Sequence, residues 1–345
     1  MRRLRRLVPR GLARAIRTRQ QRAQIRAIHR AHARATPPAP APLLPVALVI
    51  PVHDDADRLA RLLGVAAGLD VRQIIVVDDG SAVPVAAEDV TLIRHDSPRG
   101  PGAARSAGLA HVTAPYVLFL DSDDLPTAEL APLLADLAGA GDFDFCLFKH
   151  VDSRTANFGH WGQPAGDEAH WQRAGLAVGA LREAPPAVWS DLAQTTNYPW
   201  NKVYRTAFLR DHDIRCADVT LHEDIAMHWR SFLRADRMLT SDRACVWHLI
   251  DPDGARQSNR SGAERLALFD ALTPVVADDP PPAMRVAFAG FVLALTDWAR
   301  QVIDTAHRSA FDDRLARFLG QDIVDWHDDI AAADPALMAR IRDRM

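Results

Sequence analysis

Cysteine is scarce in this chain of 345 residues, and long apolar runs are missing from it. Cys146, Cys216 and Cys245 lie far apart and lack the paired spacing of a zinc site or a disulfide framework. They are expected to be reduced core residues of a cytoplasmic protein. No apolar run reaches the roughly 18 residues that a membrane-spanning helix needs. The globular part of the chain is therefore expected to be soluble.

Lysine is nearly absent as well, because Lys149 and Lys202 are the only lysines among 41 basic residues. A nucleotidyltransferase would need a glycine-rich, lysine-bearing loop directly after its first strand. The first predicted strand covers residues 46–52, and the stretch that follows it, Val-His-Asp-Asp-Ala at 52–56, contains neither residue type. The sequence therefore disfavours that class of enzyme.

Acidic residues are absent from residues 1–35, which contain 12 arginines. Subtracting these 12 positive charges from the net charge of −3 leaves −15 on the rest of the chain, so this segment is a separate basic arm. Its apolar residues recur at roughly helical spacing, which predicts either an amphipathic helix on an anionic membrane surface or a solvated tail. Nucleic-acid binding is not expected, because no aromatic residue is interleaved with the arginines. Residues 36–45, rich in proline, are predicted to form a stiff linker.

From residue 46 onward, short apolar runs alternate with helical patterns. Strands are predicted at 46–52, 73–77, 91–94, 116–120 and 143–148, and helices at 55–67 and 102–112. This alternation predicts an α/β domain over residues 46–150, doubly wound, with a mostly parallel sheet flanked by helices and a ligand crevice at the carboxyl ends of the strands. A less regular part, residues 151–260, is predicted to hold helices at 169–183, 206–212 and 224–233 and a strand at 243–248. Residues 261–345 are predicted to be a helical C-terminal region.

The most informative stretch is Val-Leu-Phe-Leu-Asp-Ser-Asp-Asp at 117–124, where a buried strand ends in carboxylates. Asp121, Asp123 and Asp124 would repel one another unless a cation lay between them, and carboxylate oxygens suit Mg²⁺ or Mn²⁺. The alternative is an acidic turn that caps the next helix.

Polar groups also follow the first two predicted strands, which end Val-Ile-Pro-Val-His-Asp at 49–54 and Val-Val-Asp-Asp-Gly-Ser at 76–81. Carboxylates at the second of these ends suit hydrogen bonds to ribose hydroxyls or base N–H groups, although Asp-Asp-Gly-Ser is also a common turn. Further along, the stretch at 99–109, Arg-Gly-Pro-Gly-Ala-Ala-Arg-Ser-Ala-Gly-Leu, opens a helix whose free N–H groups favour an anion. Arg105 would meet a diphosphate, pair with Asp78 or Asp79, or lie on the surface.

The order of these four motifs resembles that of the family 2 inverting glycosyltransferases, which have the GT-A fold. Four motifs in order within 80 residues are far more specific than any one of them. The resemblance implies that the D-x-D aspartates, Asp121 and Asp123, hold a divalent cation, Mn or Mg, and the donor diphosphate. Ser122 would lie against the donor, and the role of Asp124 is open.

The same resemblance implies the nucleotide pocket. Asp78 and Asp79 would bind the nucleotide base, and Arg105 would organise the pocket. The first motif would contact the nucleoside through Pro51, His53 and Asp54. The family usually has Tyr-Asn where this chain has His-Asp at 53–54, which leaves the identity of the base open.

The second half supplies an acid–base group. Pro-Trp-Asn-Lys-Val-Tyr-Arg at 199–205 and Leu-His-Glu-Asp-Ile at 221–225 resemble the family's W-x-K-x-Y-R segment and E-D motif. Inverting transfer needs a base to take the proton of the acceptor hydroxyl. By resemblance Asp224 is that base, and Glu223 positions the acceptor or the neighbouring backbone. Without the other motifs, the two acids would be an ordinary pair at a helix start.

Lys202 and His248 each have two interpretations. Lys202 is implied to neutralise phosphate charge or to brace the E-D loop. His248 follows a predicted strand and either reaches the metal or diphosphate, or is a core residue beside a tryptophan.

Together these features predict a metal-dependent inverting glycosyltransferase. It would move a hexosyl or N-acetylhexosaminyl group from a nucleoside diphosphate sugar, with UDP-sugars as the expected donors, to a glycan or lipid-linked acceptor. The expected setting is cell-envelope or capsule polysaccharide synthesis at the inner face of the plasma membrane, with the basic arm as a peripheral anchor. The alternative is a catalytically inactive GT-A-like module that binds glycan or serves as a scaffold. Retention of both D-x-D and E-D argues against it.

Overall fold

The computed structural model describes residues 43–155, 162–179, 181–250 and 260–345. The predicted basic arm at 1–35 and most of the linker at 36–45 lie outside these residues. Among the described helices, none combines the length and the apolar character that crossing a membrane requires.

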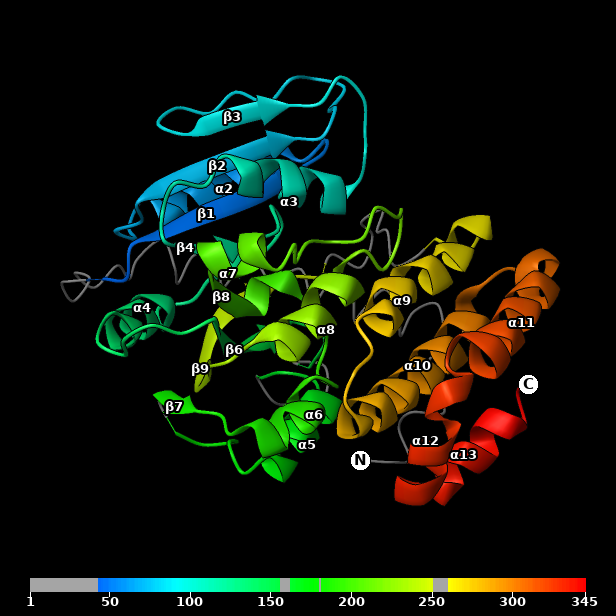
Figure 1. Cartoon of the computed structure of the whole chain (residues 1–345). Coiled ribbons are helices and arrows are strands. Elements are labelled where there is room, and N and C mark those ends of the chain that lie inside the picture. The colour runs from blue at the N-terminus through cyan, green and yellow to red at the C-terminus, as the bar shows by residue number, and fades with distance from the viewer. Residues whose placement is uncertain (1–42, 156–161, 180, 251–259) are drawn as a thin grey trace, which may run out of the picture.

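A sheet of nine strands forms the centre of the described part of the chain, in the order β3-β2-β1-β4-β8-β6-β9-β5, with β7 paired to β9 (Figure 1). The strands are β1 (Val46–Val52), β2 (Gln73–Asp78), β3 (Thr91–Arg94), β4 (Tyr116–Phe119), β5 (Leu125–Pro126), β6 (Phe145–Asp152), β7 (Leu181–Glu183), β8 (Lys202–Arg205) and β9 (Met238–His248). The first five strands predicted from the sequence are β1, β2, β3, β4 and β6.

The sheet is mixed. β3, β2, β1 and β4 run parallel, as do β6 and β9, whereas β8 lies antiparallel between β4 and β6. The sequence pattern did not predict β8 as a strand, and its residues were assigned only to the W-x-K-x-Y-R motif. Its insertion places the second half of the chain inside the same sheet as the first.

Helices cover both faces of the sheet (Figure 1). They are α2 (Ala56–Ala66), α3 (Pro101–Ala110), α4 (Leu130–Ala138), α5 (Ala165–Arg173), α6 (Trp189–Leu192), α7 (Thr206–Asp211), α8 (Asp224–Arg234), α9 (Ala267–Ala277), α10 (Pro282–Val302), α11 (Arg308–Arg317), α12 (His327–Ala333) and α13 (Pro335–Arg342). Alternate residues of β1 enter two separate cores: Leu48 and Ile50 lie in the core with α2 and α4, and Val49 lies in the core with α3 and α8. A strand buried on both faces is expected to be apolar throughout, as β1 is.

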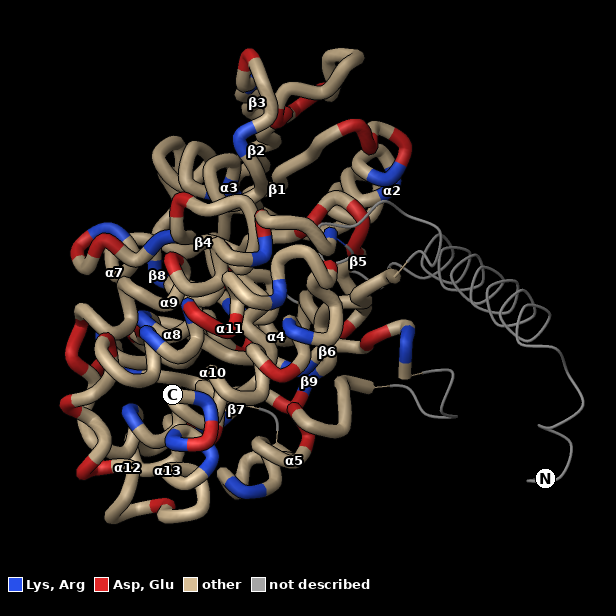
Figure 2. Tube along the Cα trace, turned by 90° about the vertical axis from the view of Figure 1, so that its right-hand side faces the viewer, with Lys and Arg blue, Asp and Glu red and all other residues tan. Residues whose placement is uncertain are grey.

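The C-terminal helices share a core with the sheet. Phe288 of α10 packs edge-on against Trp229 of α8, with ring centroids 4.8 Å apart. Basic and acidic residues are intermixed along these helices (Figure 2), and ion pairs such as Arg285–Asp329 join one helix to the next. The helical C-terminal region is therefore built onto the same face of the sheet as α3 and α8.

One predicted helix is wrong. Residues 169–183 do not form one helix, because α5 ends at Arg173 and β7 begins at Leu181. Gly175 and Gly179 between them have φ of +69° and +134°, which interrupts the helix. The last three residues of the predicted helix form β7, which pairs with β9.

Candidate active site

The predicted metal ligands lie together directly after β4. Asp121, Asp123 and Asp124 each offer a carboxylate oxygen, and these oxygens lie within 4.8 Å of one another. Burial, and then the neighbouring carboxylates, raise the pKa of Asp123 to about 7. A divalent cation would relieve this repulsion, so the donor set fits Mg²⁺ or Mn²⁺. We call these three residues the carboxylate cluster.

Two groups at the carboxyl end of β9 hold the Asp124 side chain in place. The residue is fully buried and accepts hydrogen bonds from the Leu249 amide at 3.0 Å and from His248 Nδ1 at 2.9 Å. Burial disfavours the charged imidazole, but Asp124 outweighs this effect and raises the pKa of His248. His248 thus lies beside the carboxylate cluster and orients one of its members, and its direct ligation of a metal stays a prediction.

Arg105 joins the carboxylate cluster to the E-D motif. Its guanidinium donates to Asp121 Oδ1 at 2.6 Å and to Glu223 Oε1 at 2.9 Å. The residue is buried, with 5% of its surface exposed, so both bonds form in a setting of reduced screening. The structure does not show the pairing of Arg105 with Asp78 or Asp79 that was one of the sequence-based alternatives.

Two glycines of the third motif, Gly100 and Gly102, allow α3 to lie close to Glu223. Gly100 has φ of +95°, a conformation that other residues rarely adopt, and it precedes α3. A Cβ at Gly102 would lie 2.7 Å from Glu223 Cγ and 3.1 Å from Cys216 Cβ. The first turn of α3 therefore packs against the loop that carries Glu223 and Asp224, called here the E-D loop. This contact is separate from any anion that the N–H groups of the turn bind.

Replacing Gly102 with Ala is expected to push Glu223 away from Arg105. Overpacking of this kind costs about 1–3 kcal/mol, so chemical denaturation should show a loss of that size in the free energy of unfolding. Gly64→Ala is the matched control, because nothing lies within 4 Å of a Cβ at that helical position. It should be neutral or stabilising by up to about 1 kcal/mol. Equal stabilities for the two variants would contradict this account.

Asp78 and Asp79 are each satisfied by internal hydrogen bonds. Asp78 accepts from the amides of Ser81 and Val85 and from the Arg94 guanidinium. Although burial opposes ionisation, these donors lower the pKa of Asp78.

The Asp79 carboxylate accepts from the Arg99 amide at 2.9 Å, the Gly100 amide at 2.7 Å and His95 Nδ1 at 2.7 Å. It thereby holds the loop that leads into α3. Both aspartates hold the loops that follow β2 and precede α3, and their contact with a base stays a prediction.

The first motif divides into buried and exposed residues. Pro51 is buried in β1, whereas His53 and Asp54 are exposed at its end. Asp54 has φ of +51° and accepts a 2.7 Å hydrogen bond from the Ala82 amide, so it ties the end of β1 to the loop after β2. His53 Nδ1 lies 2.9 Å from the Asp79 carbonyl oxygen. Their contacts with a nucleoside, like that of the half-buried Ser122, stay predictions.

Asp224 begins α8, next to Glu223. Burial, and then the neighbouring Glu223 carboxylate, raise the pKa of Asp224 to about 7. A carboxylate with a pKa near neutrality is suited to proton transfer, because it is partly ionised and basic enough to accept a proton. We call Glu223 and Asp224 the E-D pair. Arg105 binds the first of these acids, and the second has a pKa suited to a general base.

Comparison with known proteins shows what part of the chain is similar to. A model of "Glycosyl transferase family 2" matches residues 47–183, which include the first four motifs. Residues 47–183, less than half of the chain, thus match a family 2 glycosyltransferase domain. The pre-mycofactocin glycosyltransferase of Mycobacterium tuberculosis is 44% identical over 88 residues, 24% of this chain and 18% of the relative. Succinoglycan biosynthesis protein ExoO of Rhizobium meliloti is 35% identical over 117 residues, 30% of this chain and 33% of the relative. The matches thus span a third or less of these relatives.

Solved structures extend the likeness beyond this domain. S. aureus TarS 1-349 in complex with UDP-GlcNAc has a TM-score of 0.68 at 19% identity, with 87% of this chain and 88% of that chain covered. The same fragment with UDP has a TM-score of 0.66 at 18% identity, with 87% of each chain covered. At this identity the likeness establishes the fold, including the helical C-terminal region. The predicted GT-A fold class is confirmed.

Lys202 lies close enough to Asp224 of the E-D pair to interact with it electrostatically. It is fully buried, and its ammonium donates to the Tyr198 carbonyl at 2.8 Å and to Asn201 Oδ1 at 2.6 Å. Burial lowers the pKa of Lys202 to about 7. These contacts favour bracing of the local loop over neutralising a phosphate.

Sequence reasoning missed several residues that contact the predicted site residues. Arg94 binds Asp78 because β2 and β3 pair in register at these two positions, so the predicted parallel strands could have revealed it. Arg58 Nη1 lies 3.9 Å from Asp123, from a helix that follows β1. Tyr198 and Trp200 stack at 4.2 Å beside His248, an arrangement for which the sequence offered no spacing signal.

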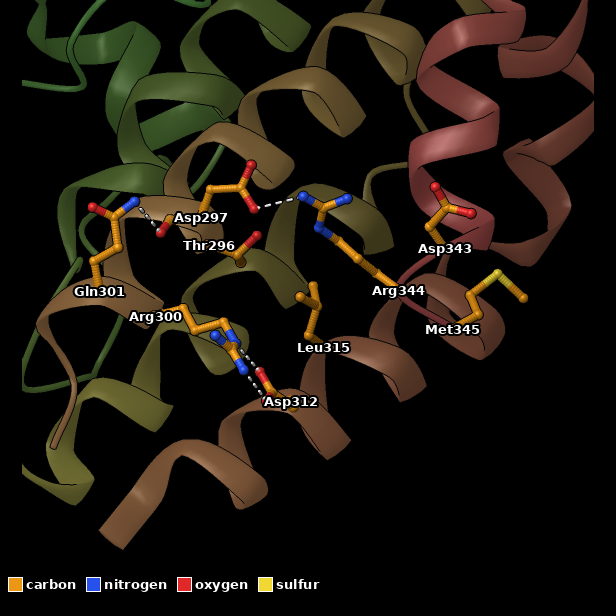
Figure 3. Close-up of a pocket in the computed structure, with 9 residues that line it drawn as sticks. All are labelled: Thr296, Asp297, Arg300, Gln301, Asp312, Leu315, Asp343, Arg344 and Met345. Atoms are coloured by element: carbon orange, nitrogen blue, oxygen red, sulfur yellow. Dashed lines mark hydrogen bonds and ion pairs between the residues drawn. The ribbon is translucent and has the colours of Figure 1, made fainter. Parts of the chain in front are cut away.

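A cavity of about 690 Å³ lies elsewhere, between the C-terminal helices (Figure 3). Arg300 and Arg344 line it, and these arginines bind Asp312 and Asp297. Its charges therefore pair with one another, and it is separate from the carboxylate cluster of the glycosyltransferase domain.

Proposed function

We propose that this chain is a metal-dependent inverting glycosyltransferase that moves a sugar from a nucleoside diphosphate sugar to an acceptor hydroxyl. The observation that carries the proposal is the pair of bonds from Arg105 to Asp121 and Glu223. One side chain thereby joins a residue predicted to hold the donor to the neighbour of the predicted base. The complex of TarS with UDP-GlcNAc supports a UDP-sugar as the donor.

The chain's own residues would act in a single displacement. Asp224 accepts the proton of the acceptor hydroxyl as that oxygen attacks the anomeric carbon, opposite the leaving nucleotide. Glu223, held by Arg105, fixes the loop that carries this base. Holding donor and acceptor together removes much of the entropic barrier.

The carboxylate cluster would hold the cation through Asp121 and Asp123. A divalent cation bound there supplies positive charge against the negative charge that develops on the leaving diphosphate. Asp124, oriented by His248 and the Leu249 amide, would support the two ligands from behind.

A thermal-shift panel tests donor binding. UDP and UDP-sugars with Mn²⁺ should raise the midpoint of thermal unfolding, because a ligand that binds only the folded state stabilises it. GDP and dTDP serve as controls for base selection, and EDTA should remove the shift. A panel in which no nucleotide raises the midpoint would count against the proposal.

The acceptor is proposed to be a cell-envelope or capsule glycan, free or lipid-linked. The relatives named for succinoglycan biosynthesis support a polysaccharide role. The 12 arginines of residues 1–35 support a peripheral position at an anionic membrane.

Deleting residues 1–35 is expected to move the protein from the membrane fraction to the soluble fraction. The expected cause is loss of attraction between the arginines and anionic lipid, so 0.5 M NaCl should release the full-length chain in the same way. Activity on a soluble acceptor should be unchanged. A truncated chain that sediments with membranes as the full-length chain does would contradict the role of the arm.

A further inference from the structure

A tryptophan of the C-terminal region contacts the residue that precedes the E-D pair and remains exposed. Trp298 is on α10 and keeps 41% of its surface exposed. Exposed single apolar residues are common, so exposure alone carries no conclusion. Its surroundings distinguish it from Val324, which is exposed to a similar degree at 46%.

The indole of Trp298 is held in place by two polar side chains. The Arg265 guanidinium carbon, from a short 3₁₀ turn at Ala263–Leu266, lies 4.7 Å from the ring centroid. The His222 ring stands edge-on to the indole at 6.1 Å, with 87° between the planes. The Arg265 side chain is fully buried. A cation against the indole face favours this orientation of the ring. We call the exposed part of the ring the platform.

His222 connects this platform to the site. It immediately precedes Glu223 and Asp224, and its backbone has φ of +66°, outside the helical region. His222 Nε2 lies 3.4 Å from Arg265 Nη1. Burial, with Arg265 beside it, lowers the pKa of His222 to about 4, so the imidazole is neutral at pH 7 and can donate and accept hydrogen bonds.

The E-D loop is therefore contacted from two sides. Glu223 meets α3 through Arg105 and Gly102, on the side of the carboxylate cluster. His222 meets Trp298 and Arg265 of the C-terminal region. Because His222 is next to Glu223 in the sequence, these contacts place Trp298 near the loop that carries Asp224.

We infer that Trp298 and His222 form an acceptor subsite that binds a pyranose ring of a saccharide, the indole stacking on its C–H face and His222 meeting a ring hydroxyl. An aromatic face and a neutral donor–acceptor group are the two contacts that an uncharged sugar ring offers. This inference deepens the proposed transfer activity and rests on it. It also assigns the C-terminal helices a part in acceptor choice.

Saturation-transfer-difference NMR on the full chain with UDP and Mn²⁺ tests the inference. Cellotetraose, chitotetraose and maltotetraose are the probes, each titrated against wild type, Trp298→Ala and Trp298→Phe. At least one probe should receive saturation at its C–H protons. Its Kd should rise about tenfold or more in Trp298→Ala and stay within about threefold in Trp298→Phe, which keeps an aromatic face. Val324→Ala is the matched control and should leave the Kd unchanged.

Two results would overturn the inference: no binding of any of the three probes to wild type, or equal binding by wild type and Trp298→Ala. Hydrolysis of UDP-sugar is measured on the same proteins to keep the two proposals apart. Val324→Ala should hydrolyse UDP-sugar at the wild-type rate, because Val324 lies outside the carboxylate cluster, the E-D pair and the proposed subsite. A wild type without UDP binding or hydrolysis would instead refute the proposed function, whatever the saccharide data show.

Discussion

Asp224→Asn should abolish sugar transfer while leaving donor binding intact. The substitution keeps the shape of the side chain and removes its ability to accept a proton, and loss of a general base typically costs about 10²- to 10⁴-fold in rate. The Kd for UDP should stay within about threefold, since the contacts predicted for the donor come from the carboxylate cluster and the β1 and β2 ends. Steady-state transfer and calorimetric UDP binding measure the two quantities.

The pH dependence supplies a second readout of the same residue. Because the pKa of Asp224 is raised to about 7 and the active form is the carboxylate, kcat should fall as pH falls below about 7. The exposed Asp313→Asn is the control and should keep both wild-type rate and pH profile. Wild-type turnover in Asp224→Asn would show that another group takes the proton.

Asp123→Ala should lose metal-dependent donor binding. Removing one of three clustered carboxylates leaves too few hard oxygen ligands to hold a divalent cation. Mn²⁺ binding, followed by titration calorimetry, should weaken by at least about tenfold, and UDP binding should no longer respond to Mn²⁺.

The pH dependence of Mn²⁺ binding gives a second test of the role of Asp123. Burial and the neighbouring acids raise the pKa of Asp123 to about 7, so Mn²⁺ must displace a proton below that pH. Mn²⁺ affinity of the wild type should therefore fall as pH falls through 7, and Asp123→Ala should lack this step. Asp313→Ala, with an exposed acid removed, should bind Mn²⁺ as the wild type does. Unchanged Mn²⁺ affinity in Asp123→Ala would remove the metal from the account.

The sequence predicted the central strands β1 and β4 because they are apolar runs buried on both faces. β1 and β3 were predicted with the bounds that the structure has, although β3 is mostly exposed. β8 was missed because its four residues become a strand only by pairing with β4 and β6. The helix predicted at 169–183 failed because Gly175 and Gly179 adopt positive φ, which a periodicity argument ignores.

The carboxylate cluster was predictable because its members are neighbours in the sequence. The pairing of Arg105 with Glu223 could not be predicted, because the two residues lie 118 positions apart and no local pattern links them. Gly102 could be read as a loop glycine, but its packing against Glu223 depends on where the E-D loop returns. His222 and Trp298 likewise meet only through the fold. Long-range pairs of this kind need the three-dimensional arrangement.

The release of UDP from UDP-sugars by the purified full-length chain tests the central claim most directly. A glycosyltransferase usually transfers some sugar to water, so UDP-GlcNAc, UDP-glucose and UDP-galactose are offered with Mn²⁺, without acceptor, to wild type and Asp224→Asn. We expect wild type to release UDP from at least one donor, EDTA to stop the release, and Asp224→Asn to release at least about 100-fold less. Binding of glycan without release of UDP from any donor would contradict the account and favour an inactive binding module.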